Sequence, residues 1–230
     1  MIEQELYRNL DLFHGCAPET VHEIVANARI HAYPAYAEII GEGHASDFLH
    51  VVLSGLVQLV ARDNGHETTM AVLEPPDTFI MAAVFLGRTH LQTARALEPA
   101  KVLLLPGAPI RALARRDIAL ANNVSAELAA AYRVMVQELK NHKLRPGLQR
   151  LANWLVRRDI EAGRTGKLVI PYEKKVLAAR LGMAPEILSR SFATLAKYDV
   201  VVEGRQVEIR DMKALLRLAR PSPLIDDPTA

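Results

Sequence analysis

Three polar residues towards the C-terminal end of the chain have the types and the spacing that base-pair recognition requires. Glu186, Ser189 and Arg190 lie in the stretch PEILSRSFATL, whose apolar residues recur at helical spacing. An arginine donates two hydrogen bonds to O6 and N7 of guanine, a glutamate accepts one from N4 of cytosine, and a serine contacts a thymine edge or a phosphate. The pattern therefore favours a helix whose first turns enter the major groove. The alternative is an ordinary surface ion pair between Glu186 and Arg190, four residues apart.

A helix-turn-helix must position these residues. Segment 173–201 begins with an apolar helical pattern, turns at Gly182, and restarts at Pro185, which suits the first position of a helix. We expect four apolar residues of the second helix to face the core: Ile187, Leu188, Phe192 and Leu195. Residues 200–210 follow as a hairpin that turns at Gly204, and this wing is expected to reach phosphates. The predicted phosphate contacts are Lys174, Lys175, Arg180, Arg205 and Gln206.

The charge distribution supports a polyanion partner for the second half of the chain. Residues 1–139 carry 10 basic and 16 acidic side chains, a net charge of −6. Residues 140–230 carry 18 basic and 10 acidic side chains, a net charge of +8. The opposite signs indicate that only the second part binds nucleic acid, although scattered surface lysines and arginines would give the same count.

Composition excludes several classes of protein. Half of the 230 residues are apolar and 23% are charged, which is typical of a globular chain. The single cysteine, Cys16, excludes an internal disulfide, a cysteine-rich zinc site and an iron–sulfur cluster, and it is expected to be a buried small residue rather than a redox switch. The opening stretch MIEQELYRNLDLF lacks the pattern of a signal peptide, and no run reaches 18 apolar residues. We therefore expect a cytoplasmic protein that has no membrane partner.

The first half predicts short helices followed by antiparallel strands. Residues 3–30 show helical spacing, whereas residues 31–105 contain short β-branched runs separated by Gly, Pro and Asn-Gly turns. The predicted strands are Glu38–Ile40, Phe48–Leu53, Gly55–Ala61, Thr68–Leu73 and Lys101–Leu105. Their regular spacing is typical of an antiparallel sandwich or barrel.

A long helix is predicted between the two parts, because no Pro or Gly interrupts residues 117–143. Its apolar seam consists of Ala121, Val124, Leu128, Ala131 and Met135, at spacings of three and four residues. Such a seam indicates a homodimer interface, and packing against a neighbouring domain is the alternative. Pro146-Gly147 ends the helix. The expected domains are therefore residues 1–116, the dimerisation helix 117–143 and residues 146–230.

This arrangement resembles the Crp/Fnr superfamily of transcription regulators, and the Glu-x-x-Ser-Arg pattern at residues 186–190 is the version found in its FNR-like members. The resemblance implies an α+β fold. It consists of an N-terminal antiparallel β-roll like that of cyclic-nucleotide-binding domains, a long dimerisation helix and a C-terminal winged helix-turn-helix. It also implies a homodimer that reads TTG-type pseudo-palindromes in double-stranded DNA, activates transcription through RNA polymerase and has no enzymatic activity. The recognition helix departs from the pattern in starting with Ala184-Pro185, without a Ser or Thr cap.

Cyclic nucleotide binding is not expected. Family members that bind cyclic AMP place Gly-Glu after Phe-Ile, and an Arg-Ser/Thr-Ala triplet about ten residues later. Met81-Ala82 and Gln92-Thr93-Ala94 occupy these positions here, so the cation for the cyclic phosphate is missing unless Arg88 or Arg95 replaces it. The cysteines of the iron–sulfur branch and the ligands of the carbon-monoxide-sensing haem branch are missing as well.

What remains is an apolar effector pocket, predicted to be lined by Phe79, Ile80, Met81, Val84, Phe85 and Leu86. Stretches such as FLHVVLSGLVQL and LARPSPLIDDP resemble the NnrR/DNR branch, which activates denitrification genes in response to nitric oxide. The resemblance implies haem as the sensor, and the candidate iron ligands are His14, His31, His50, His90 and His142.

Three other functions are alternatives to a regulator that senses nitric oxide, here called the gas sensor. One is a regulator of the same fold that needs no ligand and is controlled by its own abundance, and another is a cyclic-nucleotide-responsive regulator. A cupin-type enzyme is disfavoured, because Val52 stands where the second histidine of a His-x-His motif would follow His50. Nucleophile motifs and phosphate-binding glycine loops are missing too.

Overall fold

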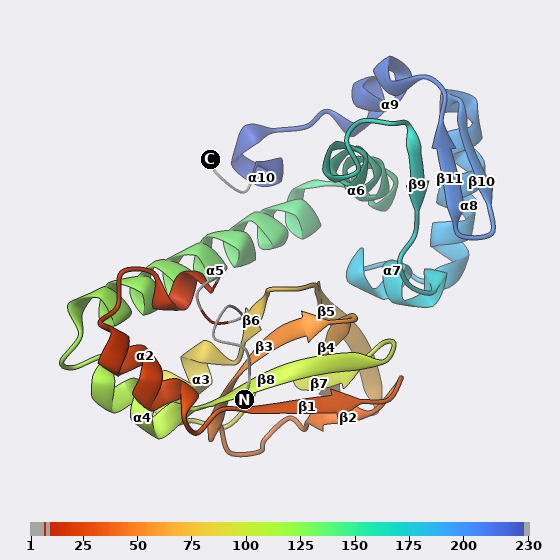
Figure 1. Ribbon diagram of the computed structural model, residues 1–230. Coiled ribbons are helices and arrows are strands. Elements are labelled where there is room, and N and C mark those ends of the chain that lie inside the picture. The colour runs from red at the N-terminus through yellow and green to blue at the C-terminus, as the bar shows by residue number, and fades with distance from the viewer. Residues whose placement is uncertain (1–6, 8–9, 228–230) are drawn as a thin grey trace. The chain divides into compact units, whose positions relative to one another are not determined.

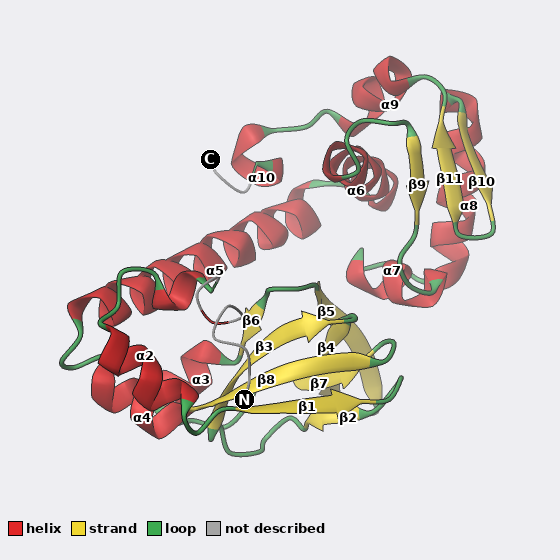
Figure 2. Ribbon diagram, in the orientation of Figure 1, coloured by secondary structure: helices red, strands yellow, loops and turns green. Residues whose placement is uncertain are grey.

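The computed structural model describes Tyr7 and residues 10–227, and it divides the chain into two compact units, Met1–Ala131 and Tyr132–Ala230. The boundary falls within one continuous helix, α5 (Ile118–Leu144). Figures 1 and 2 show helices beside a β-domain in the first unit, and helices beside a small sheet in the second. The predicted α+β fold is confirmed.

The first unit contains two four-stranded antiparallel sheets. One has the order β1 (Arg29–Tyr33), β8 (Ala100–Pro106), β3 (Phe48–Ser54) and β6 (Thr78–Phe79). The other has the order β2 (Glu38–Ile40), β7 (Thr93–Ala96), β4 (Val57–Asp63) and β5 (His66–Leu73). The five predicted strands correspond to β2, β3, β4, β5 and β8, whereas β1, β6 and β7 were not predicted.

Alternation along β3 gives the first unit two layers of core. Val52 packs with Phe79, Ala94 and Val102 in a cluster that draws on both sheets. Leu49 and Val51 belong to the other cluster, beneath the helices. Those helices are η1 (Asp11–Phe13), α2 (Pro18–Val25), α3 (Met81–Leu86), α4 (Gly107–Leu113) and the start of α5. Helices were expected within residues 3–30, of which residues 3–6, 8 and 9, including the apolar Leu6, lie outside the described residues.

The second unit packs helices against a three-stranded sheet. Its helices are α6 (Gly147–Glu161), α7 (Lys174–Arg180), α8 (Pro185–Leu195), η2 (Ala196–Tyr198), α9 (Met212–Ala219) and α10 (Pro223–Asp226). The hairpin of β10 (Val200–Glu203) and β11 (Gln206–Ile209) forms the wing, and β9 (Lys167–Val169) extends its sheet beside β11. The predicted hairpin around Gly204 is therefore present, with one strand that was not predicted.

The residues of the predicted seam of α5 lie in two different environments, one buried and one exposed. Val124 is 4% exposed and lies in the core of its own unit, and Leu128 packs against that core. These two positions are corrected to intramolecular contacts, as in the alternative reading, because the first turns of α5 cover the β-domain. Ala121 is half-buried, whereas Ala131 and Met135 are exposed. The exposed apolar residues of the following turns are Tyr132, Val134, Met135, Val136 and Leu139.

Among the helices of residues 10–227, none has the length and apolar character that a bilayer crossing needs.

Candidate nucleic-acid interface

The turn between α7 and α8 depends on Gly182. Its φ is +60°, a conformation that costs glycine little, and a Cβ there would lie 2.7 Å from the imidazole ring of His142. The Gly182 and Met183 amides donate to the carbonyls of Ala179 and Ala178, at 2.9 and 3.0 Å, and so close the end of α7. This glycine therefore fixes the sharp change of direction between the two helices.

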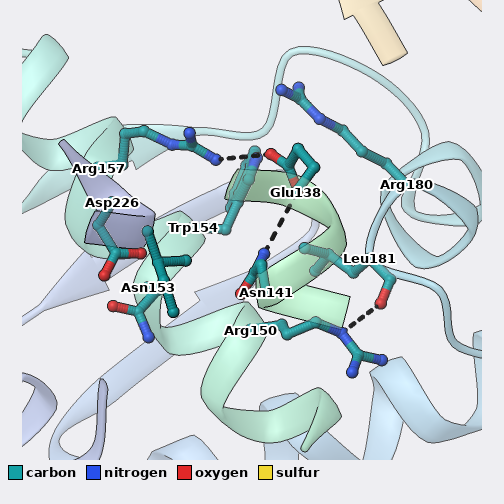
Figure 3. Close-up of a pocket in the computed structure, with 10 residues that line it drawn as sticks. Glu138, Asn141, Arg150, Asn153, Trp154, Arg157, Arg180, Leu181 and Asp226 are labelled. Carbon is teal, nitrogen blue, oxygen red and sulfur yellow. Dashed lines mark hydrogen bonds and ion pairs between the residues drawn. The ribbon is translucent and has the colours of Figure 1, made fainter. Parts of the chain in front are cut away.

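Arg150 of α6 braces the same turn and was not predicted. Its side chain donates to the carbonyls of Leu181 at 2.8 Å, Gly182 at 3.1 Å and Arg145 at 2.6 Å. Figure 3 shows the bond to Leu181. Burial lowers the pKa of Arg150, and the three carbonyls compensate for the lost hydration. In the sequence, this arginine is indistinguishable from a surface arginine on an amphipathic helix.

Helix α8 presents the predicted base-reading residues outwards. Glu186, Ser189 and Arg190 are all exposed, whereas Leu188 is 1% and Leu195 is 0% exposed. No ion pair between Glu186 and Arg190 is present in the described chain, so the surface-pair alternative is not formed here. The arrangement leaves a carboxylate and a guanidinium available on one helical face.

Ile187 corrects one expectation about this helix. It was predicted to face the core, but it is 43% exposed. Adjacent helical residues lie about 100° apart, so the core position taken by Leu188 turns Ile187 towards the rim of the exposed face. Ser191 is buried and takes part of the inner face instead. The N-cap position of the helix is Ala184, which provides no side-chain cap, as the sequence indicated.

The residues predicted to contact phosphates differ in their exposure and in their hydrogen bonds to the rest of the chain. Lys174 and Lys175 are exposed at the start of α7, and the Lys174 ammonium lies 5.3 Å from the centre of the Phe192 ring. Arg180 is half-buried and donates to the Tyr172 hydroxyl at 2.9 Å. Arg205 is exposed at the tip of the wing, although its Nε donates to the Ile170 carbonyl at 2.7 Å. Gln206 is exposed at the start of β11.

In the first unit, the six residues predicted to line an effector pocket do not form one lining. Phe79 and Ile80 pack in the cluster between the sheets, whereas Met81, Val84 and Phe85 pack in the cluster beneath the helices. Leu86 is 72% exposed. The chain changes layer at Ile80, whose φ of +75° is uncommon for a β-branched residue. The predicted pocket is therefore corrected to two separate packed clusters and one surface residue.

The positions that would hold a cyclic phosphate are occupied by internal contacts. Thr93 is 1% exposed, and its hydroxyl accepts from the Glu42 amide at 3.1 Å. Arg95, one of the possible replacement cations, forms two bonds with Glu67 at 3.0 and 3.1 Å, and Arg62 also pairs with Glu67. These arginines hold the pKa of Glu67 below its usual value, the bond from Arg95 contributing most. The positive charge of Arg95 is thus already neutralised.

The five candidate haem ligands also separate into two groups. His14, His31 and His142 are exposed, whereas His50 and His90 are each 4% exposed. The His50 ring lies 4.9 Å from that of Phe79, and its Nδ1 has no hydrogen-bond partner. Burial, followed by the charge of His90, lowers the pKa of His50 to about 4. The described residues contain no cluster of three or more His, Cys, Asp or Glu side chains able to hold a metal ion.

His90 and Cys16 are held by neighbouring polar groups. A nitrogen of the His90 ring lies 3.2 Å from the Ser46 hydroxyl, and burial lowers the pKa of this histidine. The Cys16 thiol is half-buried and donates to the Leu12 carbonyl at 3.7 Å. Burial, with the nearby Asp117 charge, raises the pKa of that thiol, so it stays protonated at neutral pH.

A winged helix-turn-helix that follows a β-domain of this kind defines a DNA-binding transcription regulator, and comparison with known proteins agrees. Residues 30–117 match the cyclic nucleotide-binding domain family, and residues 149–218 match the Crp-like helix-turn-helix domain. The cyclic AMP receptor protein of Thermus thermophilus is 30% identical over 210 residues, which cover 90% of this chain and 96% of that protein. The chain belongs to the Crp/Fnr family, which is non-enzymatic.

Two solved structures extend the comparison at the level of fold. FixK2 from Bradyrhizobium japonicum has a TM-score of 0.75 and 22% identity, covering 85% of this chain and 98% of FixK2. The sensor domain of the transcriptional regulator DNR from Pseudomonas aeruginosa has a TM-score of 0.51 and 20% identity, covering 55% of this chain and 91% of that domain. Both likenesses concern the fold alone.

Proposed function

We propose that this regulator is a homodimer that reads TTG-type pseudo-palindromes with one α8 helix in each half-site. The observation that carries the proposal is the exposed, mutually unpaired set of Glu186, Ser189 and Arg190 on one helical face. Arg190 is assigned to guanine, Glu186 to cytosine, and Ser189 to a thymine edge or a phosphate. The +8 charge of residues 140–230 supplies the salt-dependent part of the affinity.

Dimerisation is assigned to the exposed apolar stretch of α5. Tyr132, Val134, Met135 and Leu139 expose 48–69% of their surface in the isolated chain, which a partner helix would cover. Of the seam predicted from spacing, Ala131 and Met135 remain part of this proposal. We also propose a division into an effector domain (1–116), a dimerisation helix (117–143) and a DNA-binding domain (146–230), with the exposed apolar stretch of α5 assigned to the dimerisation helix.

The regulator is further proposed to be an activator that contacts RNA polymerase and controls denitrification genes in response to nitric oxide. Support comes from the resemblance to the NnrR/DNR branch and from the pairing of Arg95 with Glu67, which leaves exposed Arg88 as the remaining candidate cation for a cyclic phosphate. Cyclic nucleotide binding is not proposed.

Haem does not fit the described residues as they are arranged. Three of its candidate ligands lie on the surface, and His50 is enclosed by the chain's own side chains and contacts Phe79. No step is therefore derived through haem. The packed interior also favours a second candidate, a regulator of the same fold that needs no ligand and is controlled by its abundance.

A fluorescence anisotropy titration distinguishes these functions. Purified protein is titrated anaerobically into a TTG-type palindrome and a scrambled duplex, with and without haem and nitric oxide. Specific binding only with the effector supports the gas sensor, whereas equal specific binding in all conditions supports control by abundance. If the palindrome and the scrambled duplex bind alike at every salt concentration, the assignment of the reading residues is wrong.

A further inference from the structure

Residues 222–227, here called the tail, fold back on the last turns of α5. The Gln137 amide donates to the carbonyl of Asp227 at 2.7 Å, and the Lys140 ammonium donates to that of Leu224 at 3.2 Å. Helix α10 (Pro223–Asp226) thus lies against the last turns of α5, which belong with it to the second unit (Figure 1). The tail is therefore a fixed part of this unit.

Arg145 joins the tail to the junction of α5 and α6. It follows the last residue of α5 and precedes Pro146, and its side chain is 4% exposed. Its guanidinium donates to both carboxylate oxygens of Asp226 at 2.6 Å and to the Asn141 amide oxygen at 3.3 Å. Asp226 also accepts from the Ser222 amide at 2.6 Å. A bidentate pair whose arginine is buried and whose aspartate is partly buried has one geometry and is costly to break from the aspartate side.

The same residue is connected to the turn that orients the recognition helix. The Arg145 carbonyl accepts from Arg150, whose guanidinium also holds the carbonyls of Leu181 and Gly182. Asn153 and Gln149 of α6 both donate to the Ala219 carbonyl, at the end of α9. A continuous set of contacts therefore runs from Asp226 through Arg145 and Arg150 to the turn that precedes α8. Asp226, Asn141 and Arg150 line one small pocket here (Figure 3).

We propose that the Arg145–Asp226 pair is a positioning clamp that sets the angle between the dimer helix and the DNA-reading helices, and thereby the half-site spacing that the dimer accepts. This inference rests on the proposed function, since two reading helices on a two-fold axis must match two half-sites at once. Without the pair, the junction at Pro146-Gly147 is held by fewer directional bonds, and Gly147 is the more permissive residue. Asp226 and Arg145 touch no base, and act through the angle alone.

Spacing-dependent DNA binding tests the clamp. The preferred site is first selected from a random DNA library, so that the test does not assume the TTG sequence. Duplexes are then made with the half-site separation changed by one or two base pairs, because each base pair moves the second half-site by about 3.4 Å and turns it by about 34°. Anisotropy titrations compare the full-length protein with Asp226→Asn and Arg145→Lys. Glu161→Gln is the matched control, since it removes the same charge from an exposed ion pair of α6.

The expected result is a sharp spacing preference in the wild-type protein and in Glu161→Gln. Both clamp variants should lose about tenfold in affinity for the best spacing and show a flatter profile, while their affinity for a single half-site is unchanged. The single half-site also reports that the reading unit is folded. A wild-type profile in both clamp variants, or an equal loss on the single half-site, would overturn the clamp. A flat profile in the wild type itself would overturn the proposed dimeric reading, a different failure.

Discussion

Two surfaces of this chain, one in each unit, use charged side chains in opposite ways. In the β-domain, Arg62 and Arg95 both pair with Glu67. In the reading unit, Glu186 and Arg190 are exposed on α8 and form no ion pair with each other. A side chain that is free in the isolated chain is available for recognition. The comparison therefore supports the proposal that specificity resides on α8, whereas Arg62 and Arg95 of the first unit are engaged within the chain.

The largest effect is expected for Arg150→Ala. This change tests whether the exposed face of α8 depends on the buried hydrogen bonds that hold the preceding turn. Two buried carbonyls and the partly buried carbonyl of Gly182 lose their donor and a cavity forms, so we expect the free energy of unfolding of the second unit to fall by about 3–5 kcal/mol. Denaturant unfolding followed by Trp154 fluorescence measures this unit. Arg217→Ala, at an exposed position, is the control and should change stability by less than about 0.5 kcal/mol.

Acidification is expected to act mainly on the first unit, through His50. Its pKa is about 4 in the folded chain and 6.5 ordinarily, so the unfolded chain binds more protons between these values. Stability should be constant above about pH 6.5 and should fall by about 3 kcal/mol as the pH decreases to 4. His90, whose pKa is also lowered, acts in the same direction. His50→Leu should flatten this slope, measured by thermal unfolding across pH, whereas exposed His31→Leu should not. Equal slopes in the two variants would contradict the assignment.

Arg190→Ala tests the exposed surface of the comparison. Because Arg190 is exposed, its loss should lower the affinity for DNA but hardly change the free energy of unfolding. We expect a loss of about 1–3 kcal/mol in binding to the specific site, confined to the base pair that Arg190 reads. Titration against single-base variants of the site measures this, and the melting temperature should be unchanged. Equal losses on specific and random DNA would show that Arg190 contacts only phosphate.

The smallest effect is expected for Lys175→Ala. A lysine at a phosphate contributes to all sequences alike, so this change should weaken specific and random DNA equally and reduce the slope of log affinity against log salt by about 1. Titrations at several salt concentrations measure the slope. A change in sequence preference would instead place Lys175 at a base edge.

Sequence patterns predicted those elements that depend mainly on neighbouring residues in the chain. Strands such as Phe48–Ser54 combine apolar runs with Gly and Pro boundaries, and Gly182 has the turn position that a helix-turn-helix needs. The strands β1 and β7 were missed because they are stabilised by pairing with β8 and β4 more than by their own composition. Sequence analysis could place polar residues on the outer face of α8, since apolar spacing defines the inner face.

Long-range packing explains what sequence patterns missed. Arg150 is buried because carbonyls 31 and 32 residues away meet it, a fact that no local spacing contains. The predicted effector pocket was wrong because Ile80 reverses the side of the sheet on which the following residues lie. Val124 was assigned to a dimer seam for a similar reason. Apolar spacing along a helix shows which face is buried, but not whether the same chain or a partner covers it.

Helix α5 passes without interruption from one unit into the other, with the boundary between Ala131 and Tyr132. No loop at that point absorbs a change in chain length, so the helical phase itself connects the units. One inserted residue would rotate everything beyond it by about 100°, whereas seven would nearly restore the original direction. Replacement of the first unit of this chain is thus constrained to insertions and deletions that preserve whole turns of α5.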